Sequence, residues 1–419
     1  MPSLKREAKW AVPMTDDHHA ARSRRLLIAL VFIGTALNYV DRQVLALLKP
    51  TLEAQFHWTD QQFAHLGSVF QLSAAAALLF VGWFVDRFGV RFAYGLAVGV
   101  WSLAGIGHAA AATVGQFVVA RSVLAVAESV NTPAAVKAAA IYLPLKQRSF
   151  GLGLINTAPN IGAIITPLLI PPLALAFGWK AAFILTGALG FVWLAGWFAG
   201  TRDLVPVNPA KPSRIDNDWG VLLRDRRTWA VTGAKALTDC VWWFLLFWTP
   251  DLFARVFHMS QSQLGWPIAI IYSMAALGAL SSGLLFPLLL GRGLGINAAR
   301  KASMLFYAVL ILPIPLALHA GTPLAAALLI GVALFAHQGF STNIFGMAAD
   351  IVPAGRVASV MAAGAVAGNL TGLGIIELTG WCLDTGVGYW PMFTISATGY
   401  LVALLWIHLV LPVIRAAPD

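Results

Sequence analysis

Long apolar segments follow one another along almost the whole of this 419-residue chain. About 20 apolar residues cross a bilayer as an α-helix, since a helix satisfies its own backbone polar groups there. Charged residues make up only 11% of the chain, against about 25% in a soluble domain. We therefore predict an all-α membrane protein with twelve transmembrane helices, at residues 26–48, 62–85, 91–110, 113–136, 150–173, 181–200, 229–250, 263–290, 302–319, 323–345, 357–379 and 391–412.

One hydrophilic stretch divides these helices six and six. The resulting organisation is a tail (1–25), a six-helix bundle (26–200), an inter-bundle loop (201–227), a second six-helix bundle (228–412) and a C-terminal tail (413–419). A weak self-similarity relates the halves: at an offset of half the chain length, Pro144 maps to Pro353 and Asn160 to Asn369. Two six-helix halves related by a parallel repeat are typical of major facilitator transporters, whose substrate site lies between the halves.

The basic residues are unevenly distributed. With both termini on one face, that face receives about 21 of the 28 Lys and Arg, and the other face receives Lys49, Lys180 and Arg255. The positive-inside rule then places both termini and the middle loop in the cytoplasm. This distribution argues against a nucleic-acid partner, despite a net charge of +10. Cys240 and Cys382 lie in separate apolar segments, so we expect neither a disulfide nor a metal site.

Four charged residues lie inside the predicted helices: Asp41, Arg42, Arg121 and Glu128. Charges at membrane depth are costly and usually face a water-filled cavity or a partner. Asp41 and Arg42 point about 100° apart on a helix, whereas Arg121 and Glu128 line one face. Two cross-helix pairs are possible, Asp41 with Arg121 and Arg42 with Glu128. The pattern predicts a buried polar site that binds an anion and moves a proton; two static structural ion pairs are the alternative.

The loop between the second and third helices, residues 82–91, contains Asp86, Arg87, Gly89 and Arg91. It resembles the loop signature of the major facilitator superfamily. Gly89 permits a tight turn, and Asp86 can cap a neighbouring helix or pair with a basic residue across the bundle. We predict a conformational latch that stabilises the outward-open state. A plain basic anchoring turn is the alternative.

Further motifs at 37–43, 131–137, 160–164, 241–244 and 336–339 resemble the anion:cation symporter branch of that superfamily, and within it bacterial hexuronate transporters. The resemblance covers about residues 26–412. It implies that Asp41 and Glu128 are the protonatable pair and that Arg42 and Arg121 hold the substrate carboxylate. Under this hypothesis, protonation of Glu128 releases Arg42 to take an incoming carboxylate.

Other polar or aromatic side chains at membrane depth are candidates for substrate binding, with helix packing as the alternative for several of them: Tyr39, Gln71, Asn156, Asn160, Trp243, His337, Gln338 and Asn369. Lys235 and Asp239 lie four residues apart, so an internal ion pair is the default interpretation. Glu377 is interpreted as a rim residue.

The chain departs from the relatives at Ala74, where they usually carry a Tyr that contributes to the sugar-acid site. Gln71 and Ser73 are the polar residues nearby in sequence. We predict a monomeric proton-coupled symporter in the lipid bilayer that imports a small organic anion, with a hexuronate such as glucuronate or galacturonate as the leading substrate. The alternatives are an aldonate, a glucarate-like diacid or an aromatic acid, or a sensor that no longer transports. We expect no enzymatic activity, no metal and no cofactor besides the coupling proton.

Overall fold

The computed structural model describes residues 16–143, 145–202, 204, 219–353 and 356–414, with side chains at all of these except 16–22, 145–150, 152–154, 156 and 219. Described segments of regular structure are all helical. The N-terminal half contains α1 (Asp16–Leu47), α2 (Lys49–Phe56), α3 (Asp60–Phe88), α4 (Val90–Ala110), α5 (Val114–Glu128), α6 (Asn131–Tyr142), α7 (Leu145–Phe177) and α8 (Trp179–Gly200).

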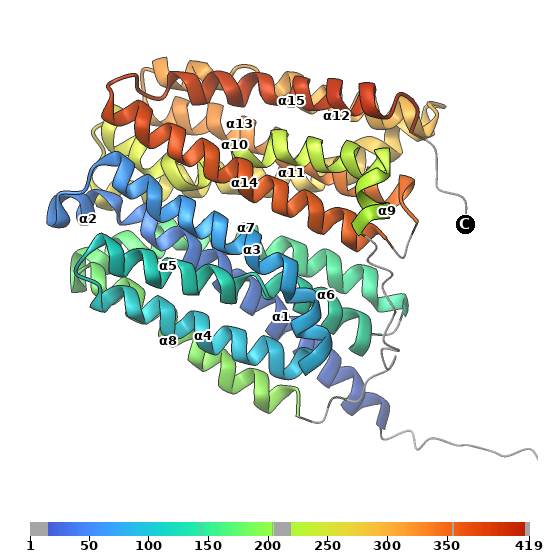
Figure 1. Cartoon of the computed structure of the whole chain (residues 1–419), viewed down its shortest axis with the longest axis horizontal. Helices are drawn as coiled ribbons and strands as arrows, with labels where there is room; N and C mark the ends of the chain where they lie inside the picture. Colours follow the sequence, from blue (N-terminus) through green and yellow to red (C-terminus); the bar gives the residue numbers. More distant parts are fainter. Residues whose placement is uncertain (1–15, 144, 203, 205–218, 354–355, 415–419) are drawn as a thin grey trace, which may run out of the picture.

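The C-terminal half repeats the arrangement with long helices joined by short turns. It contains α9 (Trp219–Arg224), α10 (Arg226–Val256), the 3₁₀ helix η1 (Gln261–Gln263), α11 (Gly265–Gly291), α12 (Ile296–Leu310), the 3₁₀ helix η2 (Ile314–His319), α13 (Pro323–Ile351), α14 (Val357–Asp384) and α15 (Trp390–Val410). Figure 1 shows the two halves as separate bundles lying side by side. The first helix begins and the last helix ends at one end of the molecule, which we call the proximal face; α2 lies at the opposite end, the distal face.

Eleven segments of the described chain are long and apolar enough to cross a membrane. The twelfth predicted helix, 113–136, is divided between α5 and α6. The Ser129 hydroxyl donates to the carbonyl of Ala125 at 2.7 Å, a back-bond that commonly bends a helix. The backbone turns at Ser129 and Val130 before α6 resumes the crossing, so the predicted fold of twelve crossings in two bundles is confirmed.

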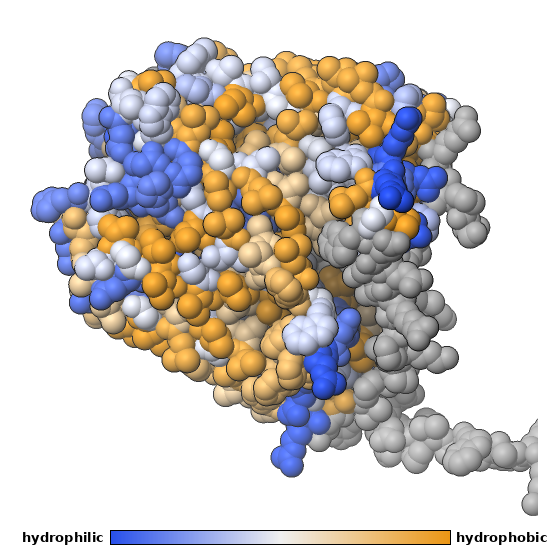
Figure 2. Space-filling view, in the orientation of Figure 1, coloured by the Kyte–Doolittle hydropathy of each residue, from blue (hydrophilic) through white to orange (hydrophobic). Residues whose placement is uncertain are grey.

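The outer surface of the bundles is apolar between two hydrophilic ends. Figure 2 shows apolar side chains over the flank of both bundles, with hydrophilic groups gathered near the distal and proximal faces. Large side chains such as Phe80, Phe177 and Leu284 are strongly exposed on the surface. A soluble monomer rarely exposes such an area, so this surface faces lipid.

Small residues set the closest helix contacts inside the N-terminal bundle. A Cβ atom added at Gly105 would lie 3.7 Å from the Cα of Gly187, which brings α4 and α8 together backbone to backbone. Without a hydrophobic driving force between helices in lipid, such close packing is a main source of helix association. The rigid bundle that results holds α1 and α5 beside α3 and α8.

Candidate functional site

The predicted pair of Arg42 and Glu128 is present in the core of the N-terminal bundle. Nε of Arg42 on α1 donates to Oε2 of Glu128, the last residue of α5, at 2.9 Å. The Glu128 side chain is fully buried, whereas 14% of the Arg42 side chain is exposed. Arg42 is therefore the member of the pair that reaches toward the space between the bundles.

The helix break after Glu128 is held by neighbouring polar side chains. Nδ2 of Asn38 donates to the Glu128 carbonyl at 3.4 Å. The Tyr94 hydroxyl donates to Oδ1 of Asn131 at 2.6 Å, and Thr35 donates to the same atom at 3.3 Å. These bonds tie the start of α6 to α1 and α4, and they hold the backbone on both sides of the break.

Arg121 is the least satisfied charge of the site. It is 2% exposed, and neither its Nε nor its Nη1 has a hydrogen-bond partner among the described residues. Its guanidinium lies over the ring of Phe70, 4.5 Å from the centroid. A buried cation without a bonded anion is costly, and a guanidinium offers the fork geometry that a carboxylate accepts. Arg121 thus has the chemistry of an anion-binding group.

The other possible pair, Asp41 with Arg121, does not form: within the ranges described, no ion pair within 4.0 Å joins them. The buried Asp41 side chain instead lies near Thr186 of α8, and Glu128 and Arg121 are the charged groups closest to it. The reason is helix geometry. Adjacent residues point about 100° apart, so Arg42 faces α5 while Asp41 turns toward α8.

Aromatic rings surround the two guanidinium groups. Cζ of Arg42 lies 5.2 Å from the ring centroid of Tyr39, 5.3 Å from that of Phe70 and 5.8 Å from that of Trp243. Trp243 belongs to α10 of the C-terminal bundle, so Arg42 lies where the two bundles meet. Desolvated cation–π contacts of this kind stabilise a cation while leaving its N–H donors available.

Two predicted amide residues lie buried with unsatisfied acceptors. Oε1 of Gln71 on α3 and Oδ1 of Asn160 on α7 have no hydrogen-bond partner among the residues described, and Oε1 of Glu128 shares this property. Buried polar atoms are normally bonded, so these atoms mark positions where a polar ligand or water is accommodated. The side chain of Asn156 lies outside the described residues.

The C-terminal candidates have different surroundings. A ring nitrogen of His337 is hydrogen-bonded to the Tyr400 hydroxyl at 2.5 Å, and the ring stacks on Trp242 at 5.3 Å. This contact is made inside the C-terminal bundle and favours a packing role, the alternative given for such residues; the role of His337 in substrate binding stays a prediction. Gln338 is half-buried on α13 and Asn369 is buried on α14. Their role in substrate binding stays a prediction.

The signature loop lies between α3 and α4 at the proximal face. Asp86 forms an ion pair with Lys137 of α6. Lys137 also donates to the Val85 carbonyl at 3.2 Å. Arg91 donates to the Phe198 carbonyl at 2.9 Å and to Thr201 at 3.1 Å. Gly89 has a φ of 77°, which favours glycine at the turn, and Arg87 is exposed. The role of this loop as a latch stays a prediction.

Sequence reasoning missed a charge cluster at the distal face, which we call the distal cluster: Lys49, Asp60 and Asp251, which are buried, and the more exposed Arg255. Nζ of Lys49 contacts Asp60 at 2.7 Å and Asp251 at 2.5 Å. Arg255 contacts the same carboxylates at 2.7 and 3.2 Å. Burial lowers the pKa of Lys49, but the carboxylates of Asp251 and Asp60 outweigh burial and raise the pKa above its ordinary value. Two residues come from each bundle, so the cluster joins the bundles.

More contacts between the bundles lie nearby. Asp384 on α14 accepts from the backbone N–H groups of Asp60 and Gln61 at 2.9 and 3.0 Å, at the positive N-terminus of α3. Glu377, interpreted as a rim residue, is hydrogen-bonded to Gln61 and contacts His65 at 2.8 Å. The carboxylates of Glu53, Asp60 and Asp251 lie close together, and Lys49 and Arg255 form ion pairs with them. The structure is closed at the distal face.

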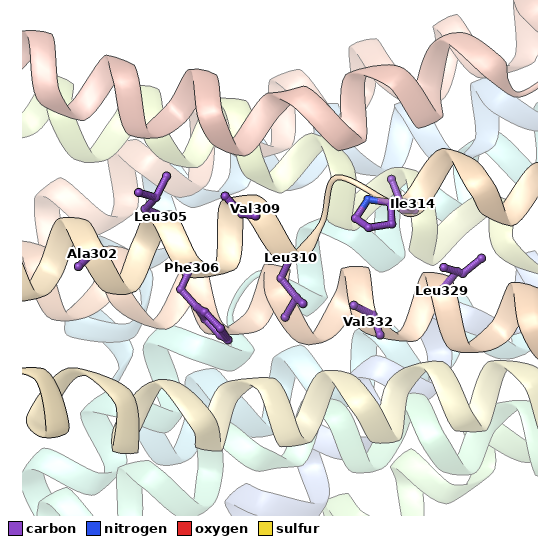
Figure 3. A pocket seen from close by; sticks show the side chains of 9 residues that line it. Ala302, Leu305, Phe306, Val309, Leu310, Ile314, Leu329 and Val332 are labelled. Atoms are coloured by element: carbon purple, nitrogen blue, oxygen red, sulfur yellow. The ribbon is translucent and has the colours of Figure 1, made fainter.

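A separate pocket lies on the lipid-facing side of α12, η2 and α13 (Figure 3). Only apolar side chains line it: Ala302, Leu305, Phe306, Val309, Leu310, Pro313, Ile314, Leu329 and Val332. Several of them are about half exposed on the surface. A lining without a charge or a hydrogen-bonding side chain cannot recognise an anion, so the candidate site is the one around Arg42 and Arg121.

Comparison with known proteins agrees with this architecture. Residues 31–375 match the family model described as the Major Facilitator Superfamily. The chain belongs to this superfamily. It is 27% identical to the hexuronate transporter of Escherichia coli K12 over 418 residues, covering 94% of this chain and 96% of that protein. It is 26% identical to a probable L-galactonate transporter of the same strain over 399 residues, covering 89% and 87%. The predicted resemblance to hexuronate transporters is confirmed.

Solved structures show the same fold. A bacterial homolog of the human lysosomal transporter Spinster, in an inward-facing and occupied conformation, superposes with a TM-score of 0.75 at 18% identity, covering 94% of this chain and 99% of that chain. The D-xylose-proton symporter gives a TM-score of 0.69 at 13% identity, covering 91% and 96%. This multi-pass membrane transporter therefore has the fold of its superfamily.

Proposed function

We propose that this protein is a proton-coupled symporter that imports a sugar acid, with a hexuronate such as glucuronate or galacturonate as the leading substrate. The observation that carries the proposal is the buried guanidinium of Arg121 beside the ion pair of Arg42 and Glu128. Its Nε and Nη1 find no acceptor among the described residues. Relatives named as hexuronate, galacturonate, L-galactonate and D-galactonate transporters support the choice of substrate class.

The charges of the site suggest how a proton is coupled to the anion. Asp41 and Glu128 balance Arg42 and Arg121, so the empty site is neutral with both carboxylates ionised. A bound monocarboxylate adds one negative charge, and one proton on a site carboxylate restores neutrality. Because an uncompensated charge at membrane depth is costly, the loaded site favours uptake of anion and proton together.

Glu128 is the carboxylate whose protonation has a direct consequence. Its Oε2 accepts from Arg42, and protonation removes the charge that holds this guanidinium. Arg42 is then free to bind the carboxylate together with Arg121, and the aromatic rings of Tyr39, Phe70 and Trp243 keep it placed. Asp41, held beside Thr186, is the second site for a proton.

Alternating access would open the site to one face at a time. With the termini in the cytoplasm, as the positive-inside rule predicts, the distal cluster closes the outer face. The bundles would then rock about the central site until this cluster separates, which admits substrate from outside.

Transport of another carboxylate is the second candidate, and Ala74 favours it. This residue is buried on α3, one turn from Phe70, and it offers no hydroxyl at the position where the family resemblance implies a Tyr. A relative from Cupriavidus necator, 23% identical over 410 residues, is named a probable sulfoacetate transporter.

Uptake of labelled glucuronate and galacturonate into proteoliposomes, with and without an inward proton gradient, tests the proposal. We expect accumulation above the external concentration only with the gradient, and loss of uptake in Arg121→Gln. Accumulation that is equal with and without the proton gradient would refute proton coupling. Uptake of sulfoacetate in the absence of sugar-acid uptake would favour the second candidate.

A further inference from the structure

The C-terminal bundle carries a polar ladder on α10. Lys235, Asp239 and Trp243 recur every four residues and therefore share one face of the helix. Each of them packs on a glycine of α14 with the same spacing. A Cβ added at Gly364 would lie 2.9 Å from Lys235, one at Gly368 would lie 2.4 Å from Asp239, and one at Gly372 would lie 2.4 Å from Trp243.

The first two residues of the ladder form an ion pair at membrane depth. Nζ of Lys235 lies 2.8 Å from Oδ2 and 3.0 Å from Oδ1 of Asp239, and the side chains are 8% and 16% exposed. The ammonium also lies 5.1 Å from the ring centroid of Phe345 on α13. A buried pair seldom stabilises a fold more than apolar residues would, so its presence calls for another role.

The ladder ends at the candidate site. Trp243 lies 5.8 Å from Arg42 across the bundle interface, and the charge of Asp239 acts on the phenol of Tyr39, which lies 5.2 Å from Arg42. One helical turn, about 6 Å of rise, separates Trp243 from Asp239. A six-carbon chain has a similar length, about 6 Å from end to end by ordinary bond lengths. A sugar acid with its carboxylate at the arginines is therefore long enough to reach the level of Asp239.

We propose that Lys235 and Asp239 form a substrate subsite that recognises the hydroxyl groups at the end of the sugar acid remote from its carboxylate. This inference rests on the proposed function and deepens it. The pair is neutral as a whole, and it offers a carboxylate that accepts from hydroxyls and an ammonium that donates to them. A second carboxylate at that end would meet the charge of Asp239. The subsite thus favours polyhydroxylated monoacids over diacids, and it gives no advantage to acids without hydroxyls.

Binding of glucuronate, glucarate and hexanoate to the purified full-length protein tests the subsite, by calorimetry in detergent. Asp239→Asn should weaken glucuronate binding about tenfold, leave hexanoate binding unchanged and raise the affinity for glucarate relative to glucuronate at least tenfold, because Lys235 is then unpaired. The double variant Lys235→Gln/Asp239→Asn should keep the loss for glucuronate and lose the part of the relative gain for glucarate that the unpaired Lys235 supplies. An equal change for all three anions in Asp239→Asn would overturn the subsite.

Asp239→Glu keeps the ion pair with Lys235, so it should fold even if Asp239→Asn is unstable. It moves the carboxylate by one methylene, so glucuronate binding should still be weakened. Unchanged glucuronate affinity in Asp239→Glu and Asp239→Asn would refute the role. The two proposals fail in distinguishable ways. A wild-type protein that binds none of the three anions overturns the proposed function and this subsite with it, whereas selective failure at Asp239 leaves the proposed function intact.

Discussion

Replacing Lys49 with Met should open the distal face. Lys49 and Arg255 balance Asp60 and Asp251, so the distal cluster is neutral. Met preserves most of the apolar stem of Lys49, which is 1% exposed, but it leaves one carboxylate charge without compensation. Separation of the bundles hydrates that charge, so the open state gains stability relative to the closed state.

The size of the effect follows from burial. Removing one partner of a buried ion pair costs about 3–5 kcal/mol. The side chain of Arg255 is 40% exposed and still contacts both carboxylates, so we take the lower value of about 3 kcal/mol. At about 1.4 kcal/mol for a factor of ten, the equilibrium shifts about a hundredfold toward the open state. An open state populated at about 1% would rise to about half.

Pulsed electron paramagnetic resonance between spin labels at Ala54 on α2 and Val387 beside α15 measures the shift in nanodiscs. Both positions are exposed, and one lies in each bundle. Cys240 and Cys382 are replaced in the background protein. We expect a longer distance to become populated in Lys49→Met. Glu53→Gln is the matched control, because this carboxylate is partly exposed and exposed pairs contribute about 0–1 kcal/mol.

A compensating change makes the reasoning refutable. Lys49→Met/Asp251→Asn restores neutrality and keeps Arg255 beside Asp60, so it should recover the closed distances. Distances in Lys49→Met that match the wild type, or a double variant as open as the single one, would refute the electrostatic account. The pKa of Lys49 is raised above its ordinary value of 10.5. The stabilisation that its charge gives is therefore complete below pH 10.5, and it is lost only as pH rises through the higher folded value. The Lys49 charge should therefore not make distal closure pH-dependent between pH 5 and 8.

Three further predictions concern the membrane-depth residues. Arg42→Ala should abolish uptake and weaken substrate binding at least tenfold, because a guanidinium–carboxylate contact is lost; near-normal affinity by calorimetry would remove Arg42 from the site. Glu128→Gln should lose proton-driven accumulation yet retain counterflow exchange, since a permanently neutral side chain still lets the loaded states alternate; accumulation against a gradient would contradict the coupling role. His337→Ala should lower the melting temperature, by an amount corresponding to about 1–3 kcal/mol from the lost bond to Tyr400, while substrate Kd stays unchanged; a large change in Kd would restore His337 to the site.

The hydropathy of the chain alone was sufficient to predict the twelve membrane crossings, but not the break between α5 and α6 or the short helices α2 and α9. In a bilayer each backbone N–H and C=O group must be bonded within the protein, so a long apolar run leaves a helix as the solution. The same cost of polarity at membrane depth singled out Asp41, Arg42, Arg121 and Glu128, since such charges persist only where a partner or a polar cavity receives them. Their identity was therefore readable from sequence.

Which charges pair was decided only by the tertiary structure. Helical spacing allowed Asp41 to meet Arg121 as readily as Arg42 to meet Glu128, and the rotation of α1 against α5 and α8 formed the second pair and not the first. That rotation depends on packing along whole helices, including glycine contacts between α4 and α8. His337 was ambiguous for the same reason, because its partner Tyr400 lies on another helix.

The distal cluster shows most clearly what the sequence alone could not predict. Lys49 and Asp251 lie 202 residues apart, and each resembles an ordinary charge at the end of an apolar segment. Local sequence determines that each residue lies near the same face of the membrane, because helix length and topology place it there. Only the docking of two bundles brings the charges within bonding distance, because that distance results from contacts spread over both halves of the chain.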